Sequence, residues 1–408
     1  MNNSRTIGLN IFIFTLSFII LTDAIFLLPQ ADLFFGKSGI MPLNFFEKYV
    51  PEHLAYLLEY NFFNKGLLIL LAFIAFLYAF AQKKLILGVV LFILFSSILK
   101  INPFLYDGSD YIILTCFPFV ILGSLHEMAK NGKSFIANTP QKRKIIHAIA
   151  NAAMLGIMLQ ICFVYLTTAL YKLETEVWQD GTALYYTLRL REFQATSYNV
   201  WLTQSAFVVK SLTYFTLAWE LLFPFLVWIK KTRYIVIGLG IAFHVGIYIF
   251  MRIEDFSWVM IGTYAIFIPD RDYMAVYKKL KQKRLIVFYD DWCPNCVRFT
   301  TIINRIDFLG NIEFKALRSQ SQANLDQYGV DLNQSQEQMA SYNLHRKANY
   351  LGFKSIAQIV ASMPATYILV PFFWLLSISS IGQWLYMELA KKRAIIPLHC
   401  NQDCKIQP

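Results

Sequence analysis

The chain has 408 residues, of which 57% are hydrophobic, 16% aromatic and only 15% charged, and its formal net charge is +11 at pH 7. A soluble domain is about half apolar and about a quarter charged, so this composition excludes an ordinary soluble protein throughout and favours lipid surroundings. The positive charge does not indicate a nucleic-acid partner, because Lys and Arg cluster at the ends of apolar runs and no stripe alternates basic with aromatic residues.

Eight apolar runs in the first 270 residues are predicted to be transmembrane helices. A helix needs about 20 apolar residues to cross the hydrocarbon, and it satisfies its own backbone polar groups there. The first run is too long for a signal-peptide core and lacks a cleavage site, so we expect it to be a retained span. The predicted spans are Ile7–Leu28, Lys65–Ala81, Leu85–Leu99, Tyr111–Glu127, Ile145–Ala169, Phe207–Ile229, Tyr234–Phe250 and Ser257–Ile268, the third and the eighth being short.

The loops between these runs predict an orientation. Cytoplasmic loops carry an excess of Lys and Arg. Placing the N-terminus in the cytoplasm puts the strongly basic loops 82–84, 128–144 and 230–233 there, together with the segment after Pro269. The outside loops are then 29–64, 100–110, 170–206 and 251–256, in which acidic and basic residues are more nearly balanced. Periodic apolar residues from Ala183 to Phe193 predict a helix lying at the interface, and the two long outside loops could roof a cavity.

Four ionisable residues lie within or at the end of predicted spans, where charge is costly and therefore usually functional: Asp23, Lys172, Glu220 and His244. Lys172 follows an apolar stretch, and desolvation there would favour a neutral amine that can accept a proton. Alternatively, its ammonium group reaches the lipid headgroups from a helix end. Glu220 and His244 could equally form a buried pair that holds two helices together. No second ligand accompanies His244 at metal spacing, so we predict no metal site.

The segment QICFVYLTTALYKLETEVWQDGTALYY, residues 160–186, resembles the signature of the HTTM superfamily, whose best-known member is the vitamin K-dependent gamma-carboxylase. Residues 220–264 resemble the next block of that family, and DLFFGKSGIMP, residues 32–42, resembles its first outside loop. The resemblance covers roughly residues 5–270.

The resemblance implies a role for each of several residues. Lys172 would be the base that deprotonates a reduced, vitamin K-like quinone, Trp178 and Gly181 would shape the pocket, and Glu220 and His244 would orient groups within it. Two departures are clear: Tyr171 stands where the carboxylase has a second lysine, and no segment could build the carboxylase's large extracytoplasmic domain. Quinone or lipid chemistry without carboxylation, and peptide modification as in sporulation-delaying-type membrane proteins, therefore remain open.

Beyond Asp270 the chain is predicted to contain a small α/β domain. Leu285–Tyr289 is an apolar, β-rich run typical of a buried strand, a helix follows from Cys293 to about Phe308, and Ile312–Ala316 is a second strand. A CxxC motif between strand and helix is typical of thioredoxin-like redox proteins. Pro294 suits the first helical turn because its missing N–H has no partner there.

The cysteine pattern gives this domain its predicted chemistry. Cys293 at a helix N-terminus, where the dipole stabilises a thiolate, would attack a disulfide, and Cys296 would resolve the intermediate. The alternative is a zinc site to which Cys400 and Cys404, or His399, contribute the second pair of ligands. The placement between strand and helix favours redox chemistry. Cys116 and Cys162 lie within apolar runs and are predicted to be core residues.

FYDDWCPNC, residues 288–296, resembles the opening YDGDCPFC of the DCC-type thiol-disulfide oxidoreductase family, and KKRAIIPLHCNQDC, residues 391–404, resembles its tail. Asp291 and Trp292 replace the family's Gly and Asp. Pro364 is a candidate for the proline that faces the dithiol in thioredoxins. The apolar run Met363–Leu376, interrupted by Pro371, is predicted to be a buried or membrane-associated helical segment rather than a ninth span.

Together these patterns predict an all-α polytopic membrane domain of about eight transmembrane helices in residues 1–270, followed by a small thioredoxin-like α/β domain in residues 284–408. The expected partners are the lipid bilayer, a quinone or a peptide, and a protein or small thiol that exchanges disulfides. Two other functions remain open: a non-catalytic anchor or a peptide-toxin maturation or immunity-type protein whose only chemistry is the dithiol, and a transporter.

Overall fold

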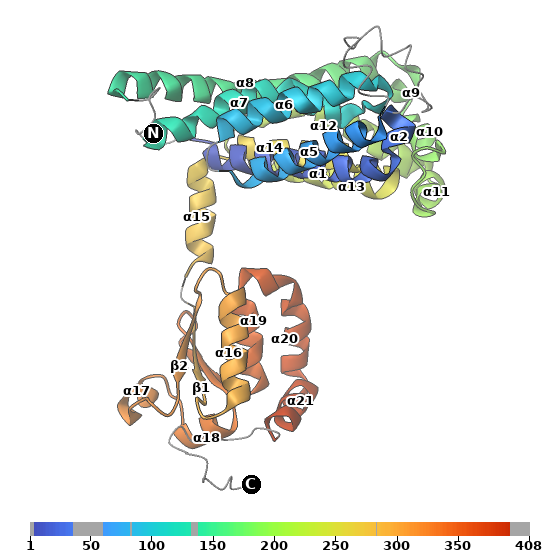
Figure 1. The fold of residues 1–408 in the computed structure, drawn as a ribbon. Helices are drawn as coiled ribbons and strands as arrows, with labels where there is room; N and C mark the ends of the chain where they lie inside the picture. Colours follow the sequence, from blue (N-terminus) through green and yellow to red (C-terminus); the bar gives the residue numbers. More distant parts are fainter. Residues whose placement is uncertain (1–3, 36–59, 82–83, 132–137, 283, 392–408) are drawn as a thin grey trace. The chain divides into compact units, whose positions relative to one another are not determined.

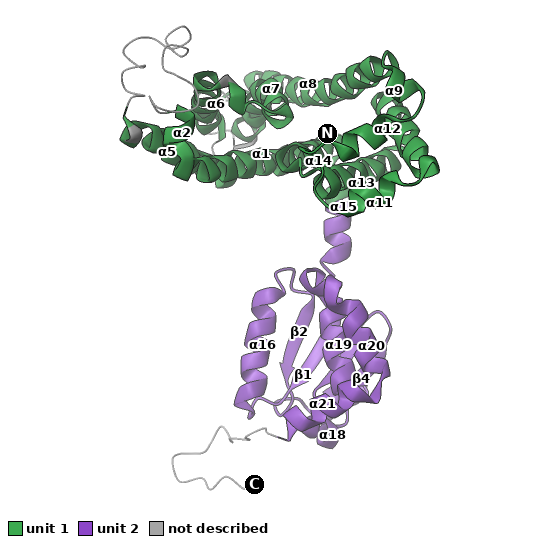
Figure 2. Ribbon diagram, turned by 90° about the vertical axis from the view of Figure 1, so that its right-hand side faces the viewer, with its two compact units in different colours: residues 1–273 green, residues 274–408 purple. Residues whose placement is uncertain are grey.

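The structure is a computed structural model that describes residues 4–35, 60–81, 84–131, 138–282 and 284–391. It divides into two compact units, Met1–Tyr273 and Met274–Pro408 (Figures 1 and 2).

Unit 1 is entirely helical over its described residues. Seven of its helical segments are long and apolar enough to cross a membrane. Its long helices are α1 (Thr6–Leu27), α5 (Asn61–Phe80), α6 (Lys84–Ile101), α7 (Gly108–Asn131), α8 (Pro140–Leu173), α12 (Ala206–Leu226), α13 (Arg233–Met251) and α14 (Glu254–Phe267). The shorter ones are η1 (Leu28–Gln30), α2 (Ala31–Phe35), η2 (Pro103–Leu105), α9 (Glu176–Gln179), α10 (Ala183–Arg189) and α11 (Tyr198–Thr203). The protein is thus a multi-pass membrane protein.

The predicted eighth span is α14, which has only 14 residues and is largely buried within the bundle. It nevertheless lies alongside α1. Near one end Asp255 lines the same small cavity as Asp23. At the other end the Asp270 carboxylate accepts hydrogen bonds from the backbone N–H groups of Thr6 and Ile7 at 3.0 and 2.8 Å. The start of α1 and the chain after α14 therefore lie at the same end of the bundle.

Several boundaries differ from the prediction, and the reason is that polar residues continue the helices beyond the apolar runs. The largest difference is in α8, which has 34 residues and is therefore about 50 Å long. It begins at Pro140, where the side chain of Thr139 caps the helix, five residues before the predicted span. The predicted interface helix is shorter than expected, because it ends at Arg189.

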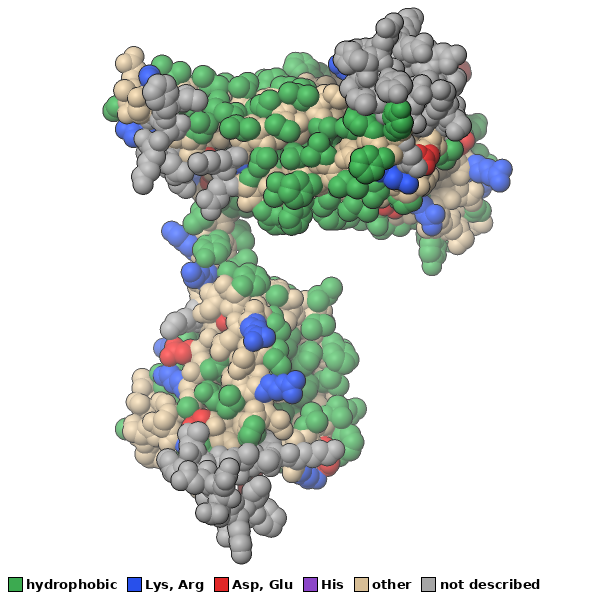
Figure 3. Space-filling view, viewed as in Figure 1, with side chains coloured by type: hydrophobic (Ala, Val, Ile, Leu, Met, Phe, Trp, Pro, Cys, Tyr) green, Lys and Arg blue, Asp and Glu red, His purple; other side chains and the backbone are tan. Residues whose placement is uncertain are grey.

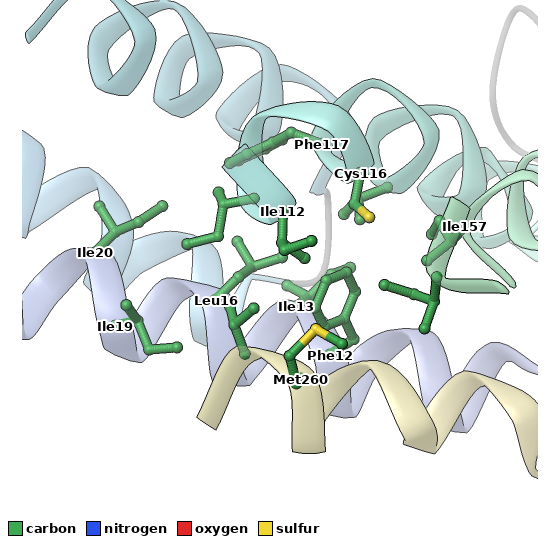
Figure 4. Packing of buried hydrophobic residues seen from close by; sticks show 14 of the residues in the cluster. Phe12, Ile13, Leu16, Ile19, Ile20, Ile112, Cys116, Phe117, Ile157 and Met260 are labelled. Atoms are coloured by element: carbon green, nitrogen blue, oxygen red, sulfur yellow. The ribbon is translucent and has the colours of Figure 1, made fainter. Parts of the chain in front are cut away.

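The core of unit 1 lies between α1, α7, α8 and α14. Figure 4 shows Phe12 and Leu16 of α1 beside Cys116 of α7, Ile157 of α8 and Met260 of α14. All five are buried. The prediction that Cys116 and Cys162 are core residues is confirmed, since both are buried and free.

The outer surface of unit 1 is also apolar. Large side chains such as Phe18, Phe73, Ile86 and Phe163 are exposed on the long helices, and hydrophobic atoms cover most of the visible flank of the bundle (Figure 3). A soluble monomer rarely exposes so large an apolar area, so this surface is suited to lipid.

Unit 2 contains a four-stranded mixed sheet in the order β2-β1-β3-β4. The strands are β1 (Leu285–Tyr289), β2 (Ile312–Ala316), β3 (Ala340–Asn343) and β4 (Ala348–Leu351). β1 pairs in parallel with β2 and antiparallel with β3. The helices are α15 (Asp270–Leu280), which begins in unit 1, α16 (Pro294–Ile306), α17 (Gln322–Gln327), α18 (Leu332–Glu337), α19 (Phe353–Ser362), η4 (Pro364–Leu369), α20 (Val370–Ile378) and α21 (Ser380–Ala390). The predicted strand, helix and second strand are all present.

Successive side chains of β1 point to opposite faces of the sheet, and both faces are covered. Leu285 and Val287 point into a cluster that contains residues of α16, α19 and α21. Ile286 and Phe288 point into a second cluster formed with Leu325 and other residues around α17 and α18. Because both faces are buried, β1 is apolar at every position, which is why its run was recognisable in the sequence.

Candidate functional sites

Lys172 lies in the last turn of α8 and reaches across to α12. Its Nζ lies 2.5 Å from Oε1 of Glu220. The Glu220 side chain is 6% exposed and the Lys172 side chain 23% exposed, so the pair is buried at the carboxylate and open at the amine. Oε2 of Glu220 is buried and accepts no hydrogen bond from the described residues. The Glu220 carboxylate is therefore held by Lys172 through one oxygen and keeps the other for a bound molecule.

Trp178 completes this site from the short helix α9. The Lys172 Nζ lies 4.7 Å from the centre of the Trp178 ring, which stabilises an ammonium group. Gly181, three residues on, has φ +80°, a conformation that other residues rarely adopt. A Cβ on Gly181 would meet the Tyr214 ring at 2.9 Å, and the Tyr214 hydroxyl donates to the Gln179 carbonyl. Gly181 thus fixes the turn after α9 rather than contacting Lys172.

His244 belongs to a different set of contacts. Its Nε2 lies 2.8 Å from the hydroxyl of Tyr165, which lies 2.5 Å from the hydroxyl of Tyr264. All three side chains are buried. The alternative of a direct Glu220–His244 pair is therefore wrong, because Glu220 is engaged by Lys172 and His244 by Tyr165.

Tyr165 and Tyr264 were not singled out in the sequence. Tyr165 stands seven residues before Lys172, two helical turns earlier on the same face of α8, and this spacing is the signal that could have found it.

An apolar cavity of ≈ 290 Å³ lies between α12, α13 and the short helices α10 and α11, and none of Lys172, Glu220 and His244 lines it. Its lining includes Thr216, one turn from Glu220, and Phe243, next to His244. The remaining lining is almost entirely aliphatic or aromatic. A cavity of this kind is suited to a ring or chain of low polarity.

Asp23 does not join Lys172. It lines a separate cavity of ≈ 150 Å³ together with Asp107, Asp110 and Asp255. The start of α8 lies at the N-terminal end of unit 1, since Arg143 and His147 share a cavity with Arg5. Lys172, the last residue but one of the 34-residue helix α8, is therefore at the opposite end of the bundle from Arg5.

In unit 2 the dithiol follows β1 directly. Cys293 is the N-cap of α16, and its Sγ accepts a hydrogen bond from the Cys296 backbone N–H at 3.3 Å. Both cysteines are free and buried, with exposed fractions of 0% and 7%. Pro294 and Asn295, between them, are exposed. The strand therefore leads into a helix N-terminus at which both cysteines are buried and the two residues between them are exposed.

A charged pair holds the turn before the dithiol. Arg318 donates from Nε to Oδ1 and from Nη2 to Oδ2 of Asp290, at 2.7 and 3.0 Å. These bonds raise the pKa of the Arg318 guanidinium, which also lies 4.1 Å from the centre of the Trp292 ring. The Asp290 carbonyl accepts the Cys293 N–H. Sequence reasoning missed Arg318, because it follows β2 and meets the dithiol turn only when the parallel strands pair.

Pro364 does not face the dithiol. Ser362, two residues earlier, is bonded to Asn311, which also contacts the start of β1, whereas the cysteines follow the other end of that strand. The cysteines follow the end of β1 at Phe288 and Tyr289. Phe288 pairs with Ala340 of β3, so the residue that comes beside this end of β1 is Met339, which precedes β3. Met339 is buried.

Cys400, Cys404 and His399 lie outside the described residues, so the zinc alternative stays a prediction. Within the described part of the chain, no third His, Cys, Asp or Glu joins the two cysteines in a group that could hold a metal ion.

Comparison with known proteins matches each unit to a family. Residues 86–271 match the model of the HTTM domain, and residues 287–397 match the model of the DCC1-like thiol-disulfide oxidoreductase. Both predicted resemblances are thereby confirmed. The HTTM match begins after the segment Asp32–Pro42. Neither a curated protein nor a solved structure matches the chain.

Proposed function

Starting from a chain that joins an HTTM domain to a DCC1-like thiol-disulfide oxidoreductase domain, we propose that the protein is a membrane-anchored protein-disulfide reductase acting through Cys293 and Cys296. The observation that carries this proposal is the position of Cys293 as N-cap of α16, with the Cys296 N–H on its sulfur. A thiolate there is stabilised both by that hydrogen bond and by the helix dipole.

The reaction is a two-electron exchange. The Cys293 thiolate attacks one sulfur of a substrate disulfide, forms a mixed disulfide and releases the other sulfur as a thiolate that takes up a proton. The Cys296 thiol loses its proton and attacks Cys293 Sγ, which releases the second substrate thiol and leaves a Cys293–Cys296 disulfide. A partner dithiol or small thiol then reduces that disulfide and is itself oxidised.

Both sulfurs lie just below the surface, so a partner must displace the covering side chains before attack. Trp292 is half-buried beside Cys293, and Arg318 lies over its ring. A partner disulfide that displaces the indole would gain access to the sulfur while the Asp290–Arg318 pair keeps the turn in place.

The test is reduction of insulin disulfides by the full chain in nanodiscs, with dithiothreitol as reductant. Cys293→Ser is expected to lower the rate to the uncatalysed level, and Cys296→Ser, once reduced and then mixed with insulin without dithiothreitol, to accumulate a mixed disulfide. Cys162→Ser, in the membrane bundle, is the matched control and should leave the rate unchanged. Undiminished activity of Cys293→Ser, or one bound zinc per chain that is lost in Cys293→Ser, would overturn the proposal.

A second function is supported by the Lys172–Glu220 pair. The pair, with Trp178 beside it, would accept a proton from a bound small molecule, most simply the hydroxyl of a reduced quinone. Glu220 Oε2 and His244 Nδ1 are buried and without hydrogen bonds among the described residues, so each offers an unused polar atom to a hydroxyl of such a ring. The quinone would supply the acidic hydroxyl. Lys172, Glu220 and His244 would bind it, orient it and hold the proton.

A lipid-like molecule or a peptide is the alternative substrate for this pair, and carboxylation of a peptide is one outcome of such chemistry. A transporter gains no support, because among the described residues the one bent pair of apolar helices lies in unit 2 rather than in the bundle.

The test for the second function uses Lys172→Arg, which keeps the charge and the contact to Glu220 but removes a transferable proton. Quinones and peptides from cells carrying this variant, Cys293→Ser or the unaltered chain are compared by mass spectrometry. A quinone or peptide changed by Lys172→Arg, and not by Cys293→Ser, supports the membrane chemistry. If only Cys293→Ser has an effect, unit 1 is an anchor.

A further inference from the structure

Unit 2 exposes a continuous apolar face on η4, α20 and α21. Ile368 is 87% exposed, Leu389 73% and Ile378 65%. The other large apolar side chains exposed on these three elements are Tyr367, Leu369, Phe372, Trp374, Leu375, Ile381, Trp384 and Leu385. In Figure 3 hydrophobic side chains gather on this flank of the unit. The area exceeds what a soluble domain normally leaves in water.

The helices that carry this face do not form one straight transmembrane helix. The α20 helix has 9 residues, about 14 Å, and the segment Pro364–Ile378 meets Ser380–Ala390 at an angle of 91°. The α21 helix is fixed to the sheet, because the Tyr386 hydroxyl accepts the Met339 N–H and Gln383 bonds both Phe353 and Gln338. The predicted alternative to a span, a membrane-associated segment, remains.

One side of α20 packs on the rest of unit 2, and the other side is exposed. The Phe373 ring stacks on Phe353 of α19, with centroids 5.8 Å apart. From Val370 to Leu376 the helix contains no polar residue. An apolar helix on a domain surface, with Trp374 exposed on it and Trp384 exposed on the next helix, has the composition of segments that enter the membrane interface.

A basic cavity of ≈ 450 Å³ adjoins this face. Lys279, Arg284, His345 and Arg346 line it, together with Val370 and Trp374 of the apolar helix, and no Asp or Glu is among its lining residues. Arg284 is held there by its bonds to the Tyr367 hydroxyl and the Lys279 carbonyl, both 2.9 Å. The basic cavity is complementary to the headgroup of an anionic lipid, and the apolar face beside it is complementary to the acyl chains of that lipid.

The chain segment that joins the two units is short enough to keep unit 2 close to the membrane. The start of β1 is 15 residues from Asp270, which lies at an end of the membrane bundle, and 15 residues span at most about 50 Å. We infer that η4, α20 and α21 form a membrane-docking face that enters the bilayer interface, and that the adjoining basic cavity takes the headgroup of an anionic phospholipid. This inference is independent of the proposed redox and proton chemistry.

The test is photo-crosslinking in the full chain, reconstituted in nanodiscs of phosphatidylcholine and phosphatidylglycerol. The crosslinker p-benzoylphenylalanine is incorporated at Phe372, at Leu389 or, as matched control, at Gln327, which is exposed on α17 beyond the other face of the sheet. We expect lipid adducts at Phe372 and Leu389 and few at Gln327. Adding Leu375→Asp should reduce the adducts at Leu389 more than tenfold, because a carboxylate opposes insertion.

The cavity is tested by the identity of the lipid. With the crosslinker at Trp374, adducts should be enriched in phosphatidylglycerol, and Arg346→Gln should lower that enrichment about fivefold without changing the adducts at Phe372. Four outcomes would each overturn the inference. They are adducts to a second copy of the chain, adducts to its own unit 1 or its own C-terminal residues, equal labelling at Gln327, and an absence of lipid adducts.

Discussion

The two candidate sites are built from the same three kinds of group but differ in what those groups can do. In unit 1, Lys172 pairs with Glu220 and lies 4.7 Å from the centre of the Trp178 ring. In unit 2, Arg318 pairs with Asp290 and lies 4.1 Å from the centre of the Trp292 ring. In both, the carboxylate is the more buried partner.

The cation makes the difference. Arginine stays protonated in proteins and binds a carboxylate through two parallel bonds, so the Asp290–Arg318 pair can only hold the dithiol turn in place. Lys172 meets Glu220 through one N–O contact only, and a lysine, unlike an arginine, can transfer its proton, so the pair is proposed both to position a ligand and to accept a proton. One pair is therefore structural support for sulfur chemistry, and the other is itself the candidate reactive group.

The largest effect expected from this comparison is on the stability of unit 2. Arg318→Gln leaves the Asp290 carboxylate, 2% exposed, without its partner, and should lower the free energy of unfolding by about 3 kcal/mol. Pulse proteolysis of the full chain measures it. Arg298→Gln, at an exposed position on α16, is the control and should have little effect. Equal stability of the two variants would show that the pair is not structural.

A smaller loss is expected when the membrane pair is broken. Lys172→Met should destabilise unit 1 by about 2 kcal/mol, since the buried Glu220 then loses its cation but can take up a proton. Lys172→Arg should retain most of the stability and lose the proton-transfer activity. Thermal unfolding in detergent separates the two. A stable Lys172→Met would mean that the ion pair contributes nothing to folding.

The two tryptophans provide the next comparison. Trp178→Leu and Trp292→Leu each remove a cation–ring contact, with an expected cost of about 1 kcal/mol at partly exposed sites. Trp292→Leu should also raise the rate of alkylation of Cys293 if, as proposed, a partner reaches this sulfur by displacing the indole. An unchanged alkylation rate would rule out Trp292 as a cover.

The smallest effect concerns the end of unit 1 from which the chain leaves. Asp270 caps α1 through the N–H groups of Thr6 and Ile7. Asp270→Asn keeps an acceptor but removes the negative charge at the helix N-terminus. The free energy of unfolding of unit 1 should therefore fall by about 0.5 kcal/mol, measured as a lower melting temperature. Asp272→Asn, two residues on, is the control. A larger loss for Asp272→Asn would contradict the capping role.

Much of the fold could be predicted because it depends on local composition. Long apolar runs specify membrane helices irrespective of their partners, and the run Leu285–Tyr289 followed by CxxC specifies a strand leading into a helix. The α14 helix was the least certain span because its apolar run is short. It is not among the seven described helices that are long and apolar enough to cross a membrane, and its place in the bundle depends on Asp270 meeting the start of α1.

The contacts of the sites could not be predicted in the same way. Lys172 was recognisable from its place at the end of an apolar helix, but its partner is 48 residues away on another helix. The assignment of His244 to Tyr165 rather than Glu220, and of Arg318 to Asp290, depends on how helices pack and strands pair.

By itself the sequence determined that this protein lies in a membrane, carries a dithiol at the start of a helix and places a lysine at the end of a span. These properties follow from hydrophobicity and from residues close together in the chain. The tertiary structure alone decided which charges pair, which proline is remote from the cysteines and which apolar helix is left uncovered. Burial and pairing between distant segments depend on packing, and packing is set by the whole fold at once.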